Sequence, residues 1–346
     1  MKTALLTGIR QIEIGETPEP EITRPDDVVV RIDAVGVCGS DVHYYSEGGI
    51  GSQRVEFPQT AGHECAGTVV KVGPGVTRLK PGQRVAIDPL IPCGNCDQCL
   101  SGRVNTCRNQ QFLGCPGEAP GALSERLAAP ARCCYPIPDS MNMAQAAMVE
   151  PFSIGLYAAR MAGIKPGAKV AILGSGPIGL CVLLACLAES SCEIYATDLL
   201  NYRLALARNC GAAWSGNPRE ENIVKEIARR EPLGVDFVFE CAGKEETLDE
   251  AVEILKPGGK LLIVGIPGTE RVSLMIHLLR RKEIAIRPVR RQNESTAAAI
   301  ELITSRLAPV DPLITHHFPF SETKKAFDLV SNYQDGVVKA IIHVSD

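Results

Sequence analysis

The sequence predicts an α/β protein in two parts, a mostly β part followed by a doubly wound parallel sheet flanked by helices. Up to about residue 152, short β-branched runs alternate with Pro- and Gly-rich turns, which is typical of strands joined by long loops. From residue 153, apolar strand-like runs alternate with helical runs, as in strand–helix–strand units. A length of 346 residues also exceeds what one core usually holds.

Composition excludes several classes of partner. A net charge of −4 gives no electrostatic reason to expect nucleic acid or an anionic membrane surface. The apolar stretch 170–188 is interrupted by Gly174-Ser175-Gly176-Pro177, so it predicts a buried strand and helix rather than a membrane span. Fourteen cysteines without a secretory apolar segment near Met1 favour a reduced, cytoplasmic protein.

In the first part, strands are expected at 28–35, 68–73 and 84–87, where β-branched residues are dense. At the other end of the chain, we expect helices at 295–305 and 321–331 and a closing strand at 336–344. Long loops between short strands are where such a domain would display a functional site.

Four cysteines lie close together in a polar, turn-rich segment of the first part. They are Cys93, Cys96, Cys99 and Cys107. Four thiolates at this spacing can enclose a tetrahedral zinc ion and leave no position for a substrate. Free thiols or a disulfide pair would be the alternatives, and we expect a structural zinc site.

A second set of ligand types surrounds a different position. Cys38 offers a thiol, His63 an imidazole and Glu64 a carboxylate, and together these suit one divalent metal. Beside them, Ser40 and His43 could carry a proton. Read singly, each of these residues could be a core or surface side chain. Together they predict a catalytic zinc site.

The second part carries a dinucleotide fingerprint in the right structural context. A strand at 169–173 leads directly into a Gly-rich turn and then a helix ending at about residue 189. Such a turn lets the backbone approach a pyrophosphate at the positive end of the helix. The turn residues expected to bind the coenzyme are Gly174, Gly176, Pro177, Ile178 and Gly179.

The next expected strand, 193–198, ends in Asp198, which can accept hydrogen bonds from an adenosine ribose and repel a 2′-phosphate. NAD is therefore expected rather than NADP, although the guanidinium of Arg203 could pair with a phosphate. Further strands at 235–240 and 260–265, with a helix at 246–256 ended by Pro and Gly, complete the sheet.

These segments resemble a known family. Two runs match the zinc-containing medium-chain alcohol dehydrogenases, namely Gly62-His63-Glu64-x2-Gly67-x5-Gly73-x2-Val76 and Cys38-Gly39-Ser40-Asp41-Val42-His43. The resemblance implies a GroES-like catalytic domain and a Rossmann coenzyme domain. It implies that Cys38 and His63 ligate the metal, that Glu64 lies in or next to its ligand shell, and that Asp41 accepts a hydrogen bond from His63.

Within this family, a glutamate at position 150 resembles the polyol dehydrogenase branch, because many other members carry a cysteine at the corresponding position. The resemblance implies that Glu150 lies beside the metal and the substrate, with direct ligation left open; a helix N-terminal acid is the simpler alternative. It also implies that Tyr44 and Arg291 orient the substrate. Polyol dehydrogenases typically have Arg-Tyr where this chain has Arg291-Gln292 after an extra Arg290, and paired guanidiniums could favour an anionic substrate.

The resemblance further implies a discontinuous catalytic domain, 1–152 with 288–346, enclosing a coenzyme domain at 153–287. A homotetramer is implied in the same way. Besides Asp198 and Arg203, the coenzyme contacts that it implies are Val264, Gly265, Ile266, Val289 and Arg290.

We therefore expect an enzyme with two zinc ions per chain that oxidises a secondary hydroxyl of a polyol, such as sorbitol or xylitol, to a ketose with NAD, reversibly. A sugar acid, a sugar phosphate or a simple secondary alcohol would be alternative substrates. From another class, a zinc- and dinucleotide-binding redox sensor without catalysis is the competing hypothesis. Such a sensor would hold about one tightly bound zinc and would not depend on Cys38.

Overall fold

The computed structural model describes residues 1–345 and divides them into two compact units. Unit 1 contains Met1–Glu150, Thr296–Thr304 and the chain from Ile314 onward. Unit 2 contains Pro151–Ser295 and Ser305–Leu313. The boundary expected from the sequence at 287/288 falls inside the last strand of the unit 2 sheet, so the next few residues stay with unit 2.

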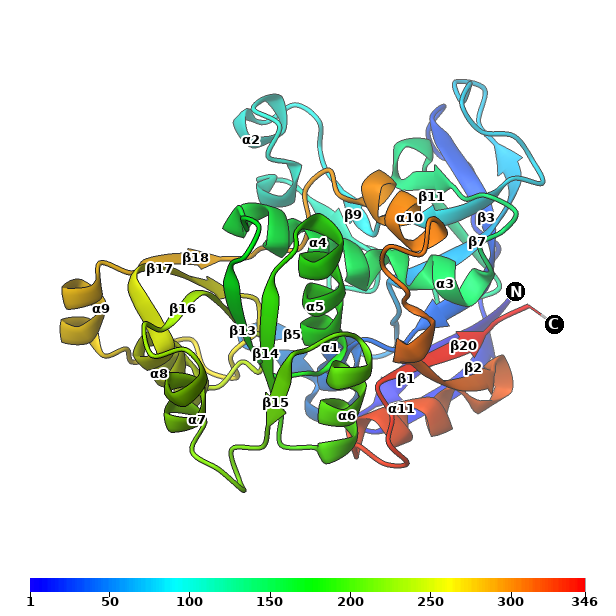
Figure 1. Ribbon diagram of the computed structural model, residues 1–346. Helices are drawn as coiled ribbons and strands as arrows, with labels where there is room; N and C mark the ends of the chain where they lie inside the picture. Colours follow the sequence, from blue (N-terminus) through cyan, green and yellow to red (C-terminus); the bar gives the residue numbers. More distant parts are fainter. Residues whose placement is uncertain (346) are drawn as a thin grey trace. The chain divides into compact units, whose positions relative to one another are not determined.

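Unit 1 is built on a mostly antiparallel sheet with the order β12-β8-β7-β3-β20-β19, and β11 also pairs with β3 (Figure 1). These strands are β3 (Asp27–Gly36), β7 (Glu64–Val72), β8 (Arg84–Ile87), β11 (Arg126–Pro130), β12 (Cys134–Pro136), β19 (Ile314–Pro319) and β20 (Lys339–His343). The three strands expected in the first part and the closing strand are confirmed. However, β7 begins at Glu64, four residues earlier than expected.

Shorter strands and helices surround this sheet. The strands are β1 (Lys2–Gly8), β2 (Gln11–Glu16), β4 (Gly49–Ile50), β5 (Gln53–Arg54), β6 (Gln59–Thr60), β9 (Leu90–Ile91) and β10 (Gln111–Phe112). The helices are α1 (Gly39–Glu47), α2 (Asp97–Leu100), α3 (Met143–Ala147), α10 (Thr296–Thr304) and α11 (Thr323–Ser331). Single 3-10 turns are η1 (Val104–Thr106), η2 (Ala131–Cys133), η3 (Asp311–Leu313, in unit 2) and η4 (Phe320–Glu322).

The C-terminal helix α11 anchors helix α1 in the unit 1 core. Tyr45 of α1 is fully buried and meets the ring of Phe327 edge-on, with the ring centroids 5.4 Å apart. Its hydroxyl donates to Asp328 at 2.7 Å. Since α1 carries the side chains expected at the catalytic site, this packing sets where they point.

Unit 2 is a six-stranded parallel sheet with the order β15-β14-β13-β16-β17-β18. The strands are β13 (Lys169–Leu173), β14 (Glu193–Thr197), β15 (Trp214–Gly216), β16 (Val235–Glu240), β17 (Leu255–Ile263) and β18 (Ala285–Pro288). The helices are α4 (Val149–Ala162, whose first two residues belong to unit 1), α5 (Pro177–Glu189), α6 (Asn201–Asn209), α7 (Ile223–Arg230), α8 (Glu245–Ile254) and α9 (Ile276–Lys282). The doubly wound parallel sheet expected from the sequence is confirmed.

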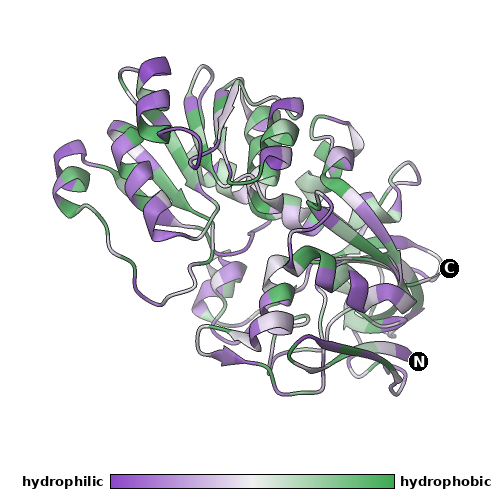
Figure 2. Ribbon diagram, turned by 90° about the horizontal axis from the view of Figure 1, so that it is seen from below, coloured by the Kyte–Doolittle hydropathy of each residue, from purple (hydrophilic) through white to green (hydrophobic). Residues whose placement is uncertain are grey.

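Helices cover both faces of this sheet. Ile227 of α7 and Leu248 of α8 pack on one face with Ala171, and α5 lies on the other face (Figure 1). In Figure 2 the strands are coloured mainly as hydrophobic and the outer helix turns as hydrophilic, as burial between helix layers requires. None of the helices in residues 1–345 is long and apolar enough to cross a membrane.

One expected boundary is wrong. The sequence predicts a helix to about residue 256 and a new strand from 260, but α8 ends at Ile254 and β17 begins directly at Leu255. The side chain of Leu255 is 1% exposed and its backbone pairs with Val235 of β16. Pairing with the neighbouring strand therefore overrides the Pro-Gly-Gly turn signal, which the strand accommodates as a register shift.

Candidate metal centres and coenzyme site

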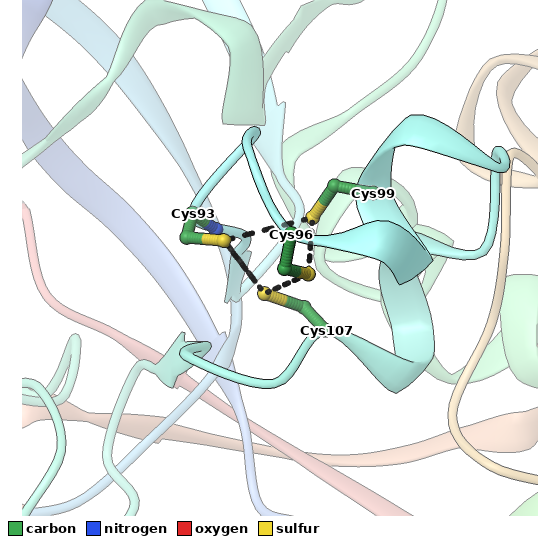
Figure 3. Close-up of side chains that lie close together, drawn as sticks. All are labelled: Cys93, Cys96, Cys99 and Cys107. Atoms are coloured by element: carbon green, nitrogen blue, oxygen red, sulfur yellow. Dashed lines mark hydrogen bonds between the residues drawn. The ribbon is translucent and has the colours of Figure 1, made fainter.

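The four cysteines that were predicted to bind zinc converge on one point. The segment that carries them, 93–107, is called the lobe below. The sulfur atoms of Cys93, Cys96, Cys99 and Cys107 all lie within 4.8 Å of one another, and Figure 3 shows them pointing inward from the loop and the α2 turn. Four of their separations are 3.4, 3.6, 3.8 and 4.0 Å. A tetrahedron with Zn–S bonds of about 2.3 Å has edges of about 3.8 Å. The arrangement therefore fits a closed zinc site.

Backbone donors favour the thiolate form of Cys93 and Cys96, whereas burial raises the pKa of the Cys99 thiol to about 12. Hydrogen bonds from backbone amides, first that of Arg108, lower the pKa of the Cys96 thiol to about 6. The backbone N–H of Cys93 donates to Cys107 Sγ at 3.3 Å. On the surface, Arg108 Nε binds Asp97 Oδ1 at 2.5 Å and ties the two ends of the lobe together. A thiolate held by amide donors is the form that binds zinc.

The second predicted set also assembles, within unit 1. Ligand atoms of Cys38, His63 and Glu64 lie within 4.8 Å of one another. Cys38 follows β3 and precedes α1, while antiparallel pairing of β3 with β7 sets Glu64 opposite Gly36. Just before β7, Gly62 has a φ of +95°, which turns the chain so that two adjacent side chains face one site.

Asp41 supports the imidazole, as the resemblance implied. Its Oδ1 lies 3.4 Å from His63 Nδ1 and accepts a hydrogen bond from Gly62 N at 3.3 Å. Burial opposes a charge on His63, but Asp41 and Cys38 together raise the pKa of His63 well above its usual value. The negative charges around His63 therefore stabilise a cation at this site. Because Asp41 contacts Nδ1, the other ring nitrogen, Nε2, remains available to bind a metal.

The structure adds a residue that sequence reasoning missed. Lys339 Nζ lies 2.6 Å from both carboxylate oxygens of Glu64 and 3.2 Å from Val37 O, and Lys339 and Glu64 are each 1% exposed. Glu64 is thus held by a cation as well as grouped with Cys38 and His63. A lysine inside the otherwise apolar closing strand was the available signal, because a buried lysine needs an anionic partner.

Glu150 lies at the beginning of α4 and is buried. Burial raises the pKa of Glu150 to about 8, with the charge of His63 opposing the rise and those of Glu64 and Asp88 adding to it. The charges of His63 and Glu64, two of the three candidate metal ligands, therefore act on the Glu150 carboxyl group. It is not part of the 4.8 Å group, however, so its role as a ligand stays a prediction.

The two expected proton carriers lie on α1 with other contacts in this structure. Ser40 Oγ donates to Cys38 Sγ at 3.3 Å. The half-exposed His43 places Nδ1 2.9 Å from Glu47 Oε1, on the same helix. Ser40 is therefore at the metal site and His43 near solvent, in the order that proton transfer outward would need.

The two expected substrate residues belong to different units. Tyr44 is buried in unit 1, and its hydroxyl lies 3.5 Å from Gln53 Oε1 and 3.8 Å from Cys115 Sγ. Burial, followed by the charge of Cys115, raises the pKa of Tyr44 well above its usual value, so the hydroxyl stays a hydrogen-bond donor. Arg291 belongs to unit 2, where its φ is +52°.

The dinucleotide fingerprint lies as expected between β13 and α5. Gly176 caps α5 and Pro177 is its first residue. Gly174 has a φ of +99°, and a Cβ on Gly179 would lie 1.9 Å from Gly174 O. Helix α5 can therefore pack closely against the turn only because positions 174 and 179 are both glycine. No side chain at these two positions then blocks the approach of a phosphate to the α5 N-terminus.

Asp198 follows β14 at the neighbouring strand end. Its Oδ2 accepts from Ser175 N at 2.9 Å, and its Oδ1 accepts from Leu200 N at 2.9 Å. Arg203 NH1 lies 3.6 Å from Oδ2. The carboxylate is thereby fixed against the Gly-rich turn, with lone pairs remaining for ribose hydroxyls.

The other expected coenzyme residues follow neighbouring strands of the same sheet. Val264, Gly265 and Ile266 come after β17, and Ile266 is 62% exposed. Val289 and Arg290 come after β18, and Val289 N donates to Ile263 O at 2.8 Å. All of these segments therefore sit at the carboxyl edge of one parallel sheet, where such sheets bind ligands.

Comparison with known proteins gives a consistent result. The family model described as the alcohol dehydrogenase GroES-like domain matches residues 24–139, and the zinc-binding dehydrogenase model matches residues 177–305. A sorbitol dehydrogenase of Bacillus subtilis is 36% identical over 99% of this chain and 97% of its own length. An L-idonate 5-dehydrogenase of Vitis vinifera is 35% identical over 94% of this chain and 90% of its own length.

Among solved structures, a zinc-binding dehydrogenase of Sinorhizobium meliloti bound to NADP matches with a TM-score of 0.90 and 30% identity, covering 99% of each chain. Full-length similarity at this level, two family models in the expected order and the assembled cysteine and glycine motifs all agree. The chain belongs to the zinc-containing medium-chain dehydrogenases, in the branch that includes sorbitol dehydrogenases, and is a zinc- and NAD(H)-dependent oxidoreductase.

Proposed function

We propose that this enzyme oxidises a secondary hydroxyl of a neutral polyol, sorbitol- or xylitol-like, to a ketose with NAD, and catalyses the reverse reaction as well. The observation that carries the proposal is the mixed set of the half-buried Cys38 and the buried His63 and Glu64, with the acid Glu150 in the position where cysteine would imply a simple alcohol dehydrogenase. The first relative compared is named a sorbitol dehydrogenase.

The residues of unit 1 divide the chemistry among them. Bound zinc supplies a Lewis acid that makes a hydroxyl easier to deprotonate near neutral pH. Asp41 orients the His63 ring for that metal. Ser40 takes the hydroxyl proton at the site, and His43 delivers it to solvent. Glu150, with a pKa of about 8, can hold or release a proton in the working pH range.

Unit 2 supplies the hydride acceptor. The α5 N-terminus and the Gly-rich turn would hold the pyrophosphate, and Asp198, fixed by Ser175 N, would hold the adenosine ribose. We propose a preference for NAD over NADP, because an ordered carboxylate at Asp198 would repel a 2′-phosphate. Arg203 offsets part of that repulsion, since its guanidinium lies 3.6 Å from Asp198.

Substrate recognition would use Tyr44, Arg291 and the extra guanidinium of Arg290. The buried Tyr44 hydroxyl suits a substrate hydroxyl. The pair of arginines leaves a sugar acid as the strongest alternative substrate, and one relative is named an L-idonate 5-dehydrogenase.

Initial rates decide between these substrates. Neutral polyols, their aldonic acids, sugar phosphates and simple secondary alcohols would each be tested with NAD and with NADP, on protein of measured zinc content. We expect two zinc ions per chain and higher kcat/KM for neutral polyols with NAD. Turnover of an acid or a phosphate without turnover of any neutral polyol would overturn the proposal.

We also propose a discontinuous catalytic domain, 1–152 with a C-terminal part that begins after the unit 2 sheet rather than at 288, and a homotetramer, both implied by the family resemblance. The support for assembly is the terminal strand β18 of the parallel sheet, with Ile276 of α9 66% exposed beside it. An open sheet edge next to apolar side chains favours pairing with another chain. Sedimentation equilibrium would test this, and a monomer at micromolar concentration would contradict it.

A further inference from the structure

A buried carboxylate without a role in the chemistry above lies at the carboxyl edge of the unit 2 sheet. Glu240 is the last residue of β16 and is 0% exposed. Its Oε1 accepts three hydrogen bonds, from Ala242 N at 2.8 Å, Gly243 N at 2.7 Å and Thr247 Oγ1 at 2.8 Å. One oxygen thus fixes the turn that leads from β16 into α8.

The backbone of the same residue fixes a second segment. Glu240 O accepts from Val264 N and from Gly265 N, each at 2.8 Å. The two segments also touch each other, because a Cβ on Gly265 would lie 2.4 Å from Gly243 N. The Gly-rich turn packs on the same loop, since a Cβ on Gly174 would lie 2.8 Å from Ala242 N. Glu240 therefore lies where three loops of the coenzyme edge meet.

The other carboxylate oxygen is the unexplained part. Glu240 Oε2 is buried and has no hydrogen-bond partner among residues 1–345. It lies 2.8 Å from where a Cβ on Gly265 would be, so it faces the underside of the segment 264–266. Native proteins rarely leave a buried carboxylate oxygen unpaired, because its desolvation is not compensated. The neighbouring strands β13 and β17 end in Leu173 and Ile263, so an acid is not a general feature of the strand ends at this edge.

A fixed negative charge at this position has a chemical consequence for a nicotinamide coenzyme. The oxidised ring carries a positive charge that the reduced ring lacks, and charges interact strongly in water-poor surroundings. The segment 264–266, which rests on Glu240, is the one expected along the nicotinamide. A carboxylate beneath it would therefore attract the oxidised coenzyme more than the reduced one.

We propose that Glu240 is a positioning residue for the coenzyme: it ties the loop 241–243 to the segment 264–266, and its charge favours binding of NAD⁺ over NADH. This rests on the proposed function for the placement of the nicotinamide. Glu240, which lies outside the Gly-rich turn, would thus help to set the ratio of the affinities for NAD⁺ and NADH.

The test is coenzyme binding to the full-length, zinc-loaded protein. Glu240→Gln keeps the size of the side chain and one acceptor oxygen but removes the charge. We expect the NAD⁺ Kd, measured by calorimetry, to rise about tenfold. The NADH Kd, measured by fluorescence, should rise less, so that the ratio of the two constants shifts.

The same strand provides a matched control. Asp236 of β16 accepts a hydrogen bond from Lys169 N at 2.8 Å, near the amino end of the sheet. Asp236→Asn also removes one negative charge and weakens a support of the sheet, but far from the coenzyme edge. It should lower the Tm while leaving the Kd ratio at the wild-type value.

The outcomes that would overturn this proposal differ from the one that would overturn the proposed function. If Glu240→Gln binds both coenzymes with an unchanged Kd ratio, or if Asp236→Asn shifts the ratio equally, Glu240 is only structural. If the wild-type protein binds neither coenzyme, the proposed function itself fails. Should Glu240→Gln not fold, Glu240→Asp serves instead: it keeps the charge on a shorter side chain, so both affinities should fall with the ratio preserved, and a shifted ratio would overturn the role of charge.

Discussion

The two metal centres of unit 1 are built in opposite ways. The lobe uses four identical sulfur ligands from one short segment, 93–107, supported mainly by backbone amides. The other centre combines a thiol, an imidazole and a carboxylate, from Cys38, His63 and Glu64; His63 and Glu64 are buried and are each supported by a charged side chain. Four sulfur ligands fill the coordination sphere of zinc, so no substrate can bind to it and the metal only stabilises the loop. A mixed set of three protein ligands leaves one coordination position of the metal for a substrate oxygen.

The largest expected effect separates the two centres by activity. Cys38→Ser should remove one of two zinc ions and lower kcat/KM at least about a thousandfold, because the Lewis acid is lost. The Tm should change little, since the lobe is intact. Zinc analysis, initial rates and calorimetry on the same sample would check this. Cys192→Ser, in unit 2 and away from both clusters, is the control, and it should keep full activity and both ions.

The lobe should respond in the reverse sense. Cys96→Ser breaks a site whose metal binding contributes directly to folding, so the Tm should fall by about 10 °C or more and one zinc should be lost. The fraction that remains folded should keep its kcat, because Cys38, His63 and Glu64 are untouched. A large fall in kcat of the folded fraction, with the Tm preserved, would mean that the lobe takes part in chemistry.

Lys339 tests how the mixed centre is supported. Replacing it with Met leaves the buried Glu64 carboxylate without its cation, which should destabilise the metal-free protein by about 3–5 kcal/mol. With zinc bound the loss should be smaller, because the metal supplies positive charge to the same carboxylate. Urea denaturation with and without zinc measures both values.

An exposed ion pair offers the control for that change. Lys324 binds Asp328 on the surface of α11 at 2.7 Å, and Lys324→Met should cost no more than about 1 kcal/mol, with or without zinc. Equal destabilisation by Lys324→Met and Lys339→Met would contradict the idea that Lys339 compensates a buried charge.

The smallest expected effect lies outside both centres. Burial, followed by the charge of His317, lowers the pKa of His343 below 6.5. The unfolded chain therefore takes up a proton at a higher pH than the folded protein does, so the stability should fall as the pH drops from about 7 to about 5. His343→Gln should flatten that slope in denaturation measured across this range, and an unchanged slope would show that folding does not lower the pKa of His343.

The sequence allowed most of the fold and the ligand sets to be predicted, and the reasons are local. Strand 169–173, the Gly-rich turn and the four-cysteine spacing are contained in short windows whose pattern reports the structure directly. Lys339 and Glu240 could not be assigned a partner in that way. Lys339 meets Glu64 across 275 residues, and the unpaired oxygen of Glu240 is visible only where three loops converge. The end of α8 was misplaced for the same reason, since β16 decides it.

The pairing of Lys339 with Glu64 also orders events during synthesis. All four lobe sulfurs leave the ribosome within one short stretch, so the lobe can capture zinc while the rest of the chain is still being made. The cation for Glu64 arrives on β20, 275 residues after the carboxylate, and β20 must then pair with β3. The buried carboxylate of Glu64 therefore gains its cationic partner only after most of unit 1 has been made, so the mixed centre is completed later in synthesis than the lobe.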